Sequence, residues 1–364
     1  MDRRTRLQQY NTMKGVAVLI CTYNGAARLP ETLRHLAQQR VAAGIRWEVV
    51  LVSNASTDDT LAVAPRLWAA LGAPAPLRVL DEPQAGKEHA LVRGFAAAAY
   101  EFMAVVDDDN WLAPGYVQRA YEVMSAHPEI GILGAHGQGA FEVPPPVWFA
   151  QFEAVYAVGP QNGGQNGPLP DKAGYLYGAG SVVRQTGWRK LLAYGFAFTT
   201  SAKRGEVLSG AEDIELGDAL RLAGYKLWYD DELRFQHFMY KERLTWEYLL
   251  RMARSTASSQ LTSVVYYFIF RHPNLTETRF RQLYAKRILW LSTQVAKKPG
   301  ALVTALSRPN DEHSTRNFET LRLLYNLKTS VTQRTAAVQV FRQVRALQQR
   351  LADLERATKS TTST

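Results

Sequence analysis

The feature that most constrains the fold is a repeated pairing of apolar runs with helical segments in the first third of the chain. Stretches with helical spacing separate four apolar runs, at residues 16–21, 47–52, 77–80 and 102–106. Apolar runs of this length, without alternating polar residues, are typical of parallel strands covered on both faces. Strands that alternate with helices indicate βαβ units. The sequence therefore predicts an α/β fold built on a mostly parallel sheet.

Polar side chains directly follow three of these runs. The first run leads into Thr22, Tyr23 and Asn24. The second leads into Asn54, and the fourth into three aspartates at 107–109. Ligands of parallel α/β sheets bind beyond the carboxyl ends of the strands. We therefore expect these polar groups to meet at one edge of the sheet and to form a site there.

Asp107, Asp108 and Asp109 are the most unusual of these strand ends. Adjacent carboxylates repel one another, and burying any of them without a cation is costly. A divalent cation is the simplest group that neutralises such a cluster. A solvated acidic turn is the alternative for a short motif taken alone. The position of the three aspartates beside two other polar strand ends favours a functional site.

Composition and charge exclude several other kinds of protein. The chain of 364 residues has a net charge of +10, with many basic residues from about Lys241 onward. Zinc-finger spacings and aromatic RNA-binding motifs are missing, so we do not expect nucleic acid as a partner. The single cysteine, Cys21, excludes an internal disulfide. Because the sequence contains no secretion signal and no apolar span of about 18 residues, we expect a cytoplasmic protein.

An ordered set of five motifs resembles the family 2 glycosyltransferases with a GT-A fold. The motifs, in chain order, are CTYN at 21–24, NASTDDT at 54–60, EPQAG at 82–86, VDDDN at 106–110, and ED at 212–213 before a helix ending in AGY at 223–225. Each motif is weak alone, and their order carries the resemblance, which covers roughly residues 15–240. Bacterial members that make exopolysaccharides and other envelope glycans look most similar.

The resemblance implies a division of the chain. A GT-A domain is expected over residues 15–240, with a nucleotide-sugar half at 15–137 and an acceptor half at 138–240. A flexible arm at 1–14 precedes it, and a helical region at 241–356 and a disordered tail at 357–364 follow it. Sequence patterns predict further strands at 175–184, 226–229 and 234–237. The spacing of apolar residues predicts helices at 246–255, 264–271, 276–295, 314–324 and 335–355.

The resemblance also implies roles for the aspartates. Asp109 matches the metal-binding position of the family's D-x-D motif, and Asp107 matches the position that binds the ribose or the metal. Asp108 would point to the sugar. His237, after the last strand, matches a residue that can complete the shell of Mn²⁺ or Mg²⁺, although a purely structural histidine is the alternative.

The other donor-binding positions are matched less completely. Thr22, Tyr23, Asn24 and Asn54 would line the nucleoside pocket. The family commonly has Asp at position 54, and an Asn there can still accept a hydrogen bond through its amide oxygen. A UDP-sugar is therefore the expected donor. Lys87 would contact the phosphates, with a solvated lysine as the alternative.

Asp213 matches the family's catalytic base, which takes a proton from the acceptor hydroxyl and implies inversion of the sugar. Glu212 would support it. A helix N-cap is the other interpretation of Asp213, and the two roles are compatible. Trp111 and Trp188 could offer faces on which a sugar stacks, but ordinary packing explains each equally well.

The basic, aromatic helices after residue 240 have two interpretations. They lie on the inner face of the plasma membrane, where a lipid-linked acceptor is found, or they form a layer that closes the active site. The acceptor would be a glycan or a lipid-linked sugar. A non-catalytic subunit that binds nucleotide or glycan is the alternative to an enzyme, and the complete set of carboxylates argues against it.

Overall fold

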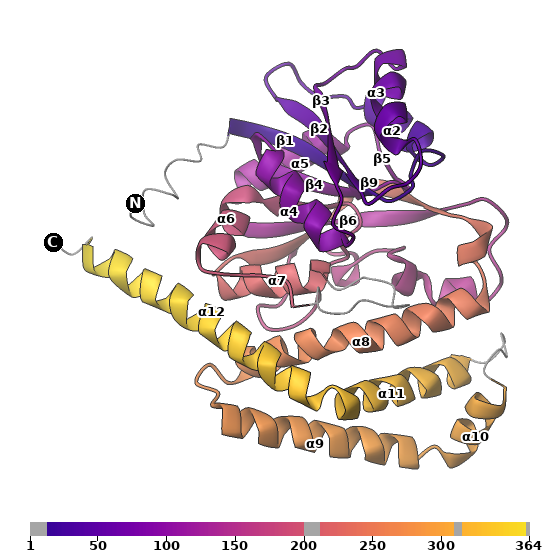
Figure 1. The fold of residues 1–364 in the computed structure, drawn as a ribbon, viewed down its shortest axis with the longest axis vertical. Coiled ribbons are helices and arrows are strands. Elements are labelled where there is room, and N and C mark those ends of the chain that lie inside the picture. Colours follow the sequence, from indigo (N-terminus) through magenta and orange to yellow (C-terminus); the bar gives the residue numbers. More distant parts are fainter. Residues whose placement is uncertain (1–12, 200–211, 309–314, 362–364) are drawn as a thin grey trace. The chain divides into compact units, whose positions relative to one another are not determined.

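The structure, a computed structural model, describes residues 13–199, 212–308 and 315–361. The chain divides into two compact units (Figure 1). The first consists of Met1–Glu142, Tyr156–Phe196 and Ala219–Met239, and the second of Val143–Val155, Ala197–Asp218 and Tyr240–Thr364. The sheet belongs to the first unit, and the long C-terminal helices belong to the second. Most of the arm expected at 1–14 lies outside the described residues, and Met13 already begins a strand.

The described part of the first unit contains a nine-stranded mixed sheet with the order β3-β2-β1-β4-β8-β6-β9-β5, and β7 pairs with β9. The strands are β1 (Met13–Thr22), β2 (Trp47–Asn54), β3 (Leu77–Glu82), β4 (Tyr100–Asp107), β5 (Asn110–Leu112), β6 (Ile130–Phe141), β7 (Gly167–Pro168), β8 (Ser181–Arg184) and β9 (Lys226–Met239). The first four strands are mutually parallel, as the apolar runs predict. The later strands β5, β7 and β8 add antiparallel pairs.

Helices cover both faces of the parallel strands, which is why these strands are almost continuously apolar. The helices of this unit are α2 (Leu29–Ala37), α3 (Thr60–Ala70), α4 (Lys87–Ala97), α5 (Tyr116–Ala126) and α6 (Gln185–Ala193). Alternate residues of β1, such as Val18, share a core with α2, α3 and α5. The intervening residue Leu19 packs on α4 at Gly94, where any side chain would collide with it. Phe95 of α4 and Trp188 of α6 then contact each other.

Three parts of this unit differ from the expected elements. The strand expected at 175–184 is confined to β8, and α6 follows it directly. The two strands expected at 226–229 and 234–237 form the single strand β9, whose pairing with β6 is interrupted between Tyr229 and Arg234. The short strand β5 was not predicted. It matters for the site, because it pairs Asn110 with His237.

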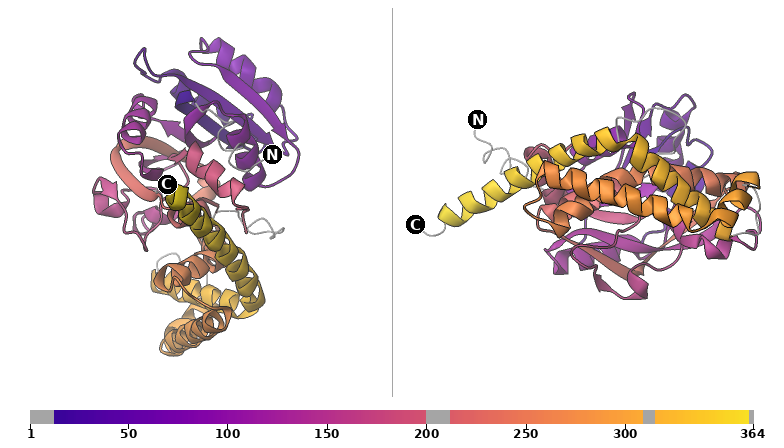
Figure 2. Two further views of the ribbon diagram at one scale, coloured as in Figure 1. Left: turned by 90° about the vertical axis from the view of Figure 1, so that its left-hand side faces the viewer. Right: turned by 90° about the horizontal axis from the view of Figure 1, so that it is seen from below.

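The second unit is helical, and its long helices pack side by side (Figures 1 and 2). They are α7 (Glu212–Leu222), which ends in the first unit, α8 (Trp246–Arg271), α9 (Glu277–Ala296), α10 (Pro299–Ser307), α11 (Thr315–Thr332) and α12 (Arg334–Thr361). Short 3-10 helices occur in the two units at Phe149–Gln151, Glu153–Tyr156, Asn162–Gly164 and Lys241–Arg243. An aromatic cluster of Trp148, Phe152, Trp246 and Phe318 contributes to the core of the second unit.

The helical region agrees with the sequence in kind and differs in its boundaries. The two helices expected at 246–255 and 264–271 form the single helix α8. Helix α10 was not expected, and α12 continues to Thr361, into the segment expected as a tail. Among the described residues, no helix is both long enough and apolar enough to span a bilayer.

Candidate active site

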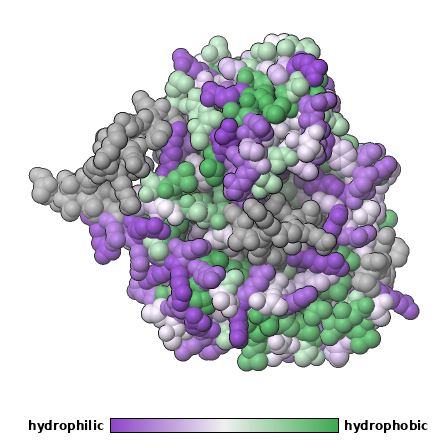
Figure 3. Space-filling view, in the orientation of Figure 1, coloured by the Kyte–Doolittle hydropathy of each residue, from purple (hydrophilic) through white to green (hydrophobic). Residues whose placement is uncertain are grey.

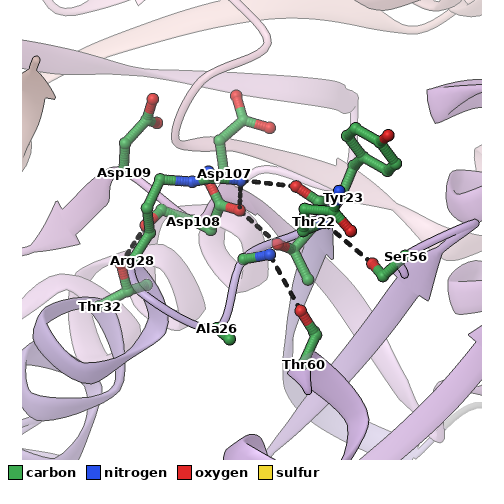
Figure 4. Close-up of polar contacts among 12 residues, drawn as sticks. Thr22, Tyr23, Ala26, Arg28, Thr32, Ser56, Thr60, Asp107, Asp108 and Asp109 are labelled. Atoms are coloured by element: carbon green, nitrogen blue, oxygen red, sulfur yellow. Dashed lines mark hydrogen bonds and ion pairs between the residues drawn. The ribbon is translucent and has the colours of Figure 1, made fainter. Parts of the chain in front are cut away.

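The carboxyl ends of β2, β1 and β4 meet as the sequence predicts. β1 lies between the other two, with Thr22 opposite Ser53 and Cys21 opposite Asp107. The loops that follow these strands therefore lie side by side at one edge of the sheet (Figure 4). Burial of Cys21 beneath them raises the pKa of its thiol to about 12, so this residue stays protonated and takes no part in nucleophilic chemistry.

Hydrogen bonds join the loop after β1 to the loop after β2. The backbone N–H of Asn24 donates to Ser56 Oγ at 3.0 Å, and the N–H of Ala26 donates to Asp58 Oδ2 at 3.1 Å. In return, Asn24 Oδ1 accepts from the N–H of Thr57 at 2.7 Å. Asn24 has a left-handed backbone with φ of 48°, which asparagine tolerates better than most residues. Its amide oxygen thus shapes the loops, and its predicted nucleoside contact would have to use the amide nitrogen.

Thr22 and Tyr23 point in different directions. Thr22 is buried and its hydroxyl donates to the Asp108 carboxylate, so the predicted contact of Thr22 with a nucleoside is replaced by an internal one. The side chain of Tyr23 is 59% exposed. Its backbone carbonyl accepts from Arg28 Nη2 at 2.7 Å, which fixes the loop below the ring. Of the two, Tyr23 presents a surface that a ligand can reach.

The carboxylate of Asp108 is directed into the protein (Figure 4). Arg28 donates to both of its oxygens, at 2.9 Å through Nε and 2.7 Å through Nη2, and Thr32 Oγ1 donates to its backbone carbonyl at 2.6 Å. Burial raises the pKa of Asp108, and the hydrogen bonds and charge of Arg28 act in the opposite direction. These contacts contradict the predicted role of Asp108 as a sugar ligand, because its oxygens serve the scaffold.

Arg28 is the residue of this site that the sequence did not reveal. Its side chain joins the loop after β1, at Tyr23, to the loop after β4, at Asp108. A cation for a buried aspartate was expected on general grounds. Nothing in the sequence distinguishes Arg28 from the many other basic residues that could supply that charge.

Asp107 and Asp109 project to the opposite side from Asp108 (Figure 4). Asp107 is the last residue of β4, and Asp108 and Asp109 form the turn between β4 and β5. The Asp107 carboxylate forms an ion pair with Lys87, which is the first residue of α4. The predicted phosphate ligand Lys87 and the predicted ribose or metal ligand Asp107 thus lie beside each other.

Asp109 faces His237, which β5 and β9 bring to the same place. His237 Nδ1 is 2.8 Å from the Tyr156 carbonyl, and since a carbonyl can only accept, Nδ1 carries the proton. The other nitrogen, Nε2, lies 3.5 Å from Asp109 Oδ1. In the neutral imidazole both of these atoms are acceptors, so the pair favours a cation or a proton between them. In metal sites, the histidine nitrogen that does not bind the metal commonly donates to a backbone carbonyl, which fixes the orientation of the ring.

The metal ligand set is smaller than the sequence predicts. In the described residues, no group of three or more His, Cys, Asp and Glu side chains is placed to hold a metal ion. Asp109 and His237 form a pair, and Asp107 is bound to Lys87. Two protein ligands fit Mg²⁺ or Mn²⁺ in a site where the phosphates of a substrate supply further oxygens. The donor set therefore fits a metal that binds together with a diphosphate.

Asn54 holds the loop before α4. Its amide nitrogen donates to the carbonyls of Glu82, at 3.1 Å, and Gln84, at 2.7 Å. Its amide oxygen accepts from the N–H of Gly86 at 2.9 Å. All three contacts are internal, so Asn54 does not offer the free acceptor that the sequence predicts. An aspartate could not donate to the two carbonyls, which explains an asparagine at this position.

Neither predicted acceptor tryptophan has a ring face to offer. Trp111 stacks between His35 and Phe238, with ring centroids 5.4 Å and 4.6 Å away. Trp188 is buried and packs against Phe95 and Phe196. Packing accounts for the position of both residues, and their stacking on a sugar stays a prediction.

Glu212 and Asp213 begin α7, in the second unit. Glu212 is buried, and Asp213 Oδ1 lies 2.8 Å from the N–H of Ile214. Asp213 is the second residue of the helix and not the residue before it, so it does not occupy the N-cap position. Farther along, the Glu215 carboxylate accepts from the N–H of Thr199 at 3.0 Å. The assignment of Asp213 as the base stays a prediction.

Comparison with known proteins shows similarity to glycosyltransferases. Residues 17–185 match the family model described as glycosyl transferase family 2. An uncharacterized glycosyltransferase of Nostoc sp. is 29% identical over 118 residues, which are 32% of this chain and 35% of that protein. The match thus spans about a third of that relative's length. Residues 17–185 are therefore similar to the family 2 glycosyltransferases.

One solved structure supports the architecture. A mannosyltransferase from Pyrobaculum calidifontis, in complex with GDP-Man and Mn²⁺, is 19% identical with a TM-score of 0.53, and the match covers 91% of this chain and 92% of that one. Residues 1–349 of TarS from S. aureus, in complex with UDP, are 16% identical with a TM-score of 0.48, covering 89% and 92%. The predicted α/β GT-A fold with additional C-terminal helices is confirmed.

Proposed function

We propose that this chain transfers a sugar from a nucleotide-sugar, with a UDP-sugar as the expected donor, to a hydroxyl of a glycan or lipid-linked acceptor. One observation carries the proposal: Asp109 and His237 face each other beside the ion pair of Asp107 and Lys87. The family match over residues 17–185 supports the same reaction class. Synthesis of a bacterial cell-surface polysaccharide is the setting that we infer from the resemblance.

The donor would lie across the loops at the ends of β1, β2 and β4. The exposed ring of Tyr23 offers the base a stacking surface, and Asp107 can accept hydrogen bonds from ribose hydroxyls. To contact the diphosphate, Lys87 would exchange part of its ion pair with Asp107 for a contact with the phosphate oxygens. Because Lys87 is the first residue of α4, the backbone N–H groups of that helix end favour the same anion.

Asp109 and His237 would hold Mn²⁺ or Mg²⁺. A bound divalent cation stabilises the negative charge that develops on the departing diphosphate. The mannosyltransferase of the same fold was solved with Mn²⁺, which supports the choice of ion. On the protein side, the Tyr156 carbonyl keeps His237 Nε2 unprotonated and directed at Asp109. The two residues are thereby preorganised before a donor arrives.

Asp213 would act on the acceptor. The acceptor oxygen attacks the anomeric carbon, the bond from that carbon to the phosphate oxygen breaks, and the hydroxyl proton passes to Asp213. A single displacement of this kind inverts the anomeric centre. Glu212, the buried neighbour of Asp213, would support the helix end that carries the base.

The test is a transfer assay with a panel of nucleotide-sugars and Mn²⁺ or Mg²⁺. Asp213→Asn should lower kcat by roughly 10²- to 10⁴-fold, as expected for loss of a general base, and should leave UDP binding in calorimetry unchanged. Glu247→Gln is the matched control, because Glu247 is an exposed acid in the first turn of α8. Full activity in the Asp213→Asn protein would refute the base assignment.

The same assay separates an enzyme from a binding subunit. Tight UDP binding with neither transfer nor donor hydrolysis, across the whole panel and with both metals, would favour the non-catalytic alternative. Metal-dependent transfer with inverted product stereochemistry, measured by NMR of the anomeric proton, would establish the proposed reaction.

A further inference from the structure

Four exposed apolar side chains of the second unit lie on two consecutive helices. On α9 and α10 these are Leu289 (66% exposed), Trp290 (55%), Val303 (68%) and Leu306 (58%). Figure 3 shows hydrophobic surface where Figure 1 draws the end of α9 and α10. The two helices contact each other, and the exposed Lys297 and Lys298 join them. We call these six residues the α9–α10 face.

On each helix, the exposed residues of this face lie on one side and the buried residues on the other. On α9, the exposed residues Lys286, Leu289, Trp290 and Lys297 recur at helical spacing, while Phe280, Tyr284 and Leu291 are buried on the other side. On α10, Val303 and Leu306 are three residues apart, while Ala301 and Ala305 are buried. Each helix therefore has one apolar side packed in the unit and a second apolar side that faces solvent.

The charged residues of α9 after Glu277 and of α10 with its flanking residues have one sign. From residue 278 to 309 the sequence contains seven Lys or Arg and no Asp or Glu. The nearest acid toward the N-terminus, Glu277, is already bound by Arg281 and Arg342, and these contacts lower its pKa to about 2. The acidic residue at the start of α9 is thus neutralised locally, and the lysines at the far end meet no carboxylate on their own helices.

We propose that the α9–α10 face docks on the surface of an anionic lipid bilayer. Exposed Trp and Leu with neighbouring Lys are the combination by which helices lie in the interface, with the indole at the headgroup level and the ammonium groups on lipid phosphates. A second copy of this chain would bring the same positive charges together, so charge disfavours that occupant. The proposal does not depend on the proposed transfer reaction.

Flotation of the full chain with vesicles tests the proposal. Vesicles of phosphatidylcholine alone are compared with equimolar phosphatidylcholine and phosphatidylglycerol, at low and high salt, without nucleotide-sugar or acceptor. We expect binding to the anionic vesicles at low salt and its loss at high salt. Because no substrate is present, this experiment can fail while the transfer reaction stands, and the reverse also holds.

Two variants separate charge from apolar contact. Lys297→Glu with Lys298→Glu should weaken binding at least about 30-fold, since each basic residue near an anionic surface contributes roughly fivefold and the new carboxylates add repulsion. Trp290→Ala with Leu306→Ser should weaken binding about tenfold through lost apolar burial. The matched control combines Lys328→Glu with Val331→Ser on α11, where both residues are also exposed, and it should bind as the unmodified chain does.

Three results would overturn the proposal. The first is a full chain that does not float with anionic vesicles at low salt. The second is equal binding by the control and by both α9–α10 variants. The third is a dimer in sedimentation velocity that Trp290→Ala with Leu306→Ser dissociates while flotation is unchanged, since a second copy would then be the occupant. Unfolding midpoints by circular dichroism should be equal in all variants, because the replaced side chains are exposed.

Discussion

Two acidic clusters of the first unit have similar composition and different surroundings. The strand-end cluster is Asp107, Asp108 and Asp109, and the bend cluster is Asp230, Asp231 and Glu232. In the strand-end cluster one carboxylate faces inward to an arginine, and the outer two face Lys87 and His237 at the edge of the sheet. The surroundings of the carboxylates, and not the run of acids itself, therefore distinguish the two clusters.

The bend cluster is matched by cations within the protein. Arg119 forms ion pairs with Asp230 at 2.8 Å and Glu232 at 3.0 Å. Asp230 Oδ1 also accepts from the backbone N–H of Leu233, which shapes the interruption in β9. Asp231 accepts from Tyr229, from His136 at 2.8 Å and from Arg234. These contacts account for the cluster as a structural element.

The largest expected effect separates the clusters by activity. Asp109→Asn should lower kcat/KM at least about 100-fold in a transfer assay, because a neutral amide beside His237 is a poor ligand for a divalent cation. Asp230→Asn is the counterpart and should leave kcat/KM per folded molecule unchanged. UDP binding by calorimetry with and without Mn²⁺ is the second measurement, and the dependence on metal should disappear in Asp109→Asn alone. Equal losses in both variants would remove the distinction drawn here.

The second effect is on stability, and here the bend cluster should be the more sensitive of the two clusters. Asp230 is buried and balances Arg119, so Asp230→Asn should lower the free energy of unfolding by about 2 kcal/mol, less than for a fully buried pair because Arg119 is part-exposed. Asp109→Asn should change it by less than about 0.5 kcal/mol. Urea unfolding followed by circular dichroism measures both. A stable Asp230→Asn protein would show that hydrogen bonding, and not charge, holds the bend.

The place of the strand-end cluster at the edge of the sheet could be predicted from the sequence. The apolar runs and their polar ends predicted that Asp107 and Asp109 lie at the edge of the sheet, because the carboxyl ends of parallel strands meet there. The sequence did not predict which acid turns inward, since that depends on Arg28, a residue 80 positions away from Asp108. The same limit explains Asn54, whose partners Glu82 and Gln84 belong to another strand end.

Trp111 shows the same limit, because its surroundings also depend on residues that are distant in the sequence. Trp111 lies two residues after Asp109, and that proximity in sequence suggested a sugar contact. Its neighbours His35 and Phe238 come from α2 and β9, which no local pattern connects to it. In the helical unit, by contrast, the spacing of apolar residues located the long helices well. The α9–α10 face could not be predicted, because an exposed and a buried apolar stripe have the same period.

The third prediction concerns the inward acid of the strand-end cluster. Arg28→Ala leaves Asp108 without its cation and should lower the free energy of unfolding by about 1–2 kcal/mol, a value reduced from that of a fully buried pair because Arg28 is part-exposed. The donor KM should rise as well, since Arg28 also holds the Tyr23 carbonyl. Urea unfolding and donor titration are the measurements. Asp108→Asn combined with Arg28→Ala should recover part of the stability, and no recovery would argue against the ion pair as the cause.

The smallest expected effect is the pH dependence of the bend cluster. Hydrogen bonds from Tyr229 and His136 lower the pKa of Asp231 to about 2, below its value of roughly 3.9 in an unfolded chain. The folded state therefore binds the Asp231 proton less tightly, and the resulting stabilisation is complete above about pH 5 and is lost as the pH falls toward 2. Since this side chain is near the surface, the contribution should be under about 1 kcal/mol. Urea unfolding at pH 7 and pH 3 should show Asp231→Asn less stable than the unmodified chain at pH 7 and a smaller difference at pH 3. A difference that is equal at both values would mean that Asp231 acts as a hydrogen-bond acceptor whose charge does not matter, and the two clusters would then differ in geometry alone.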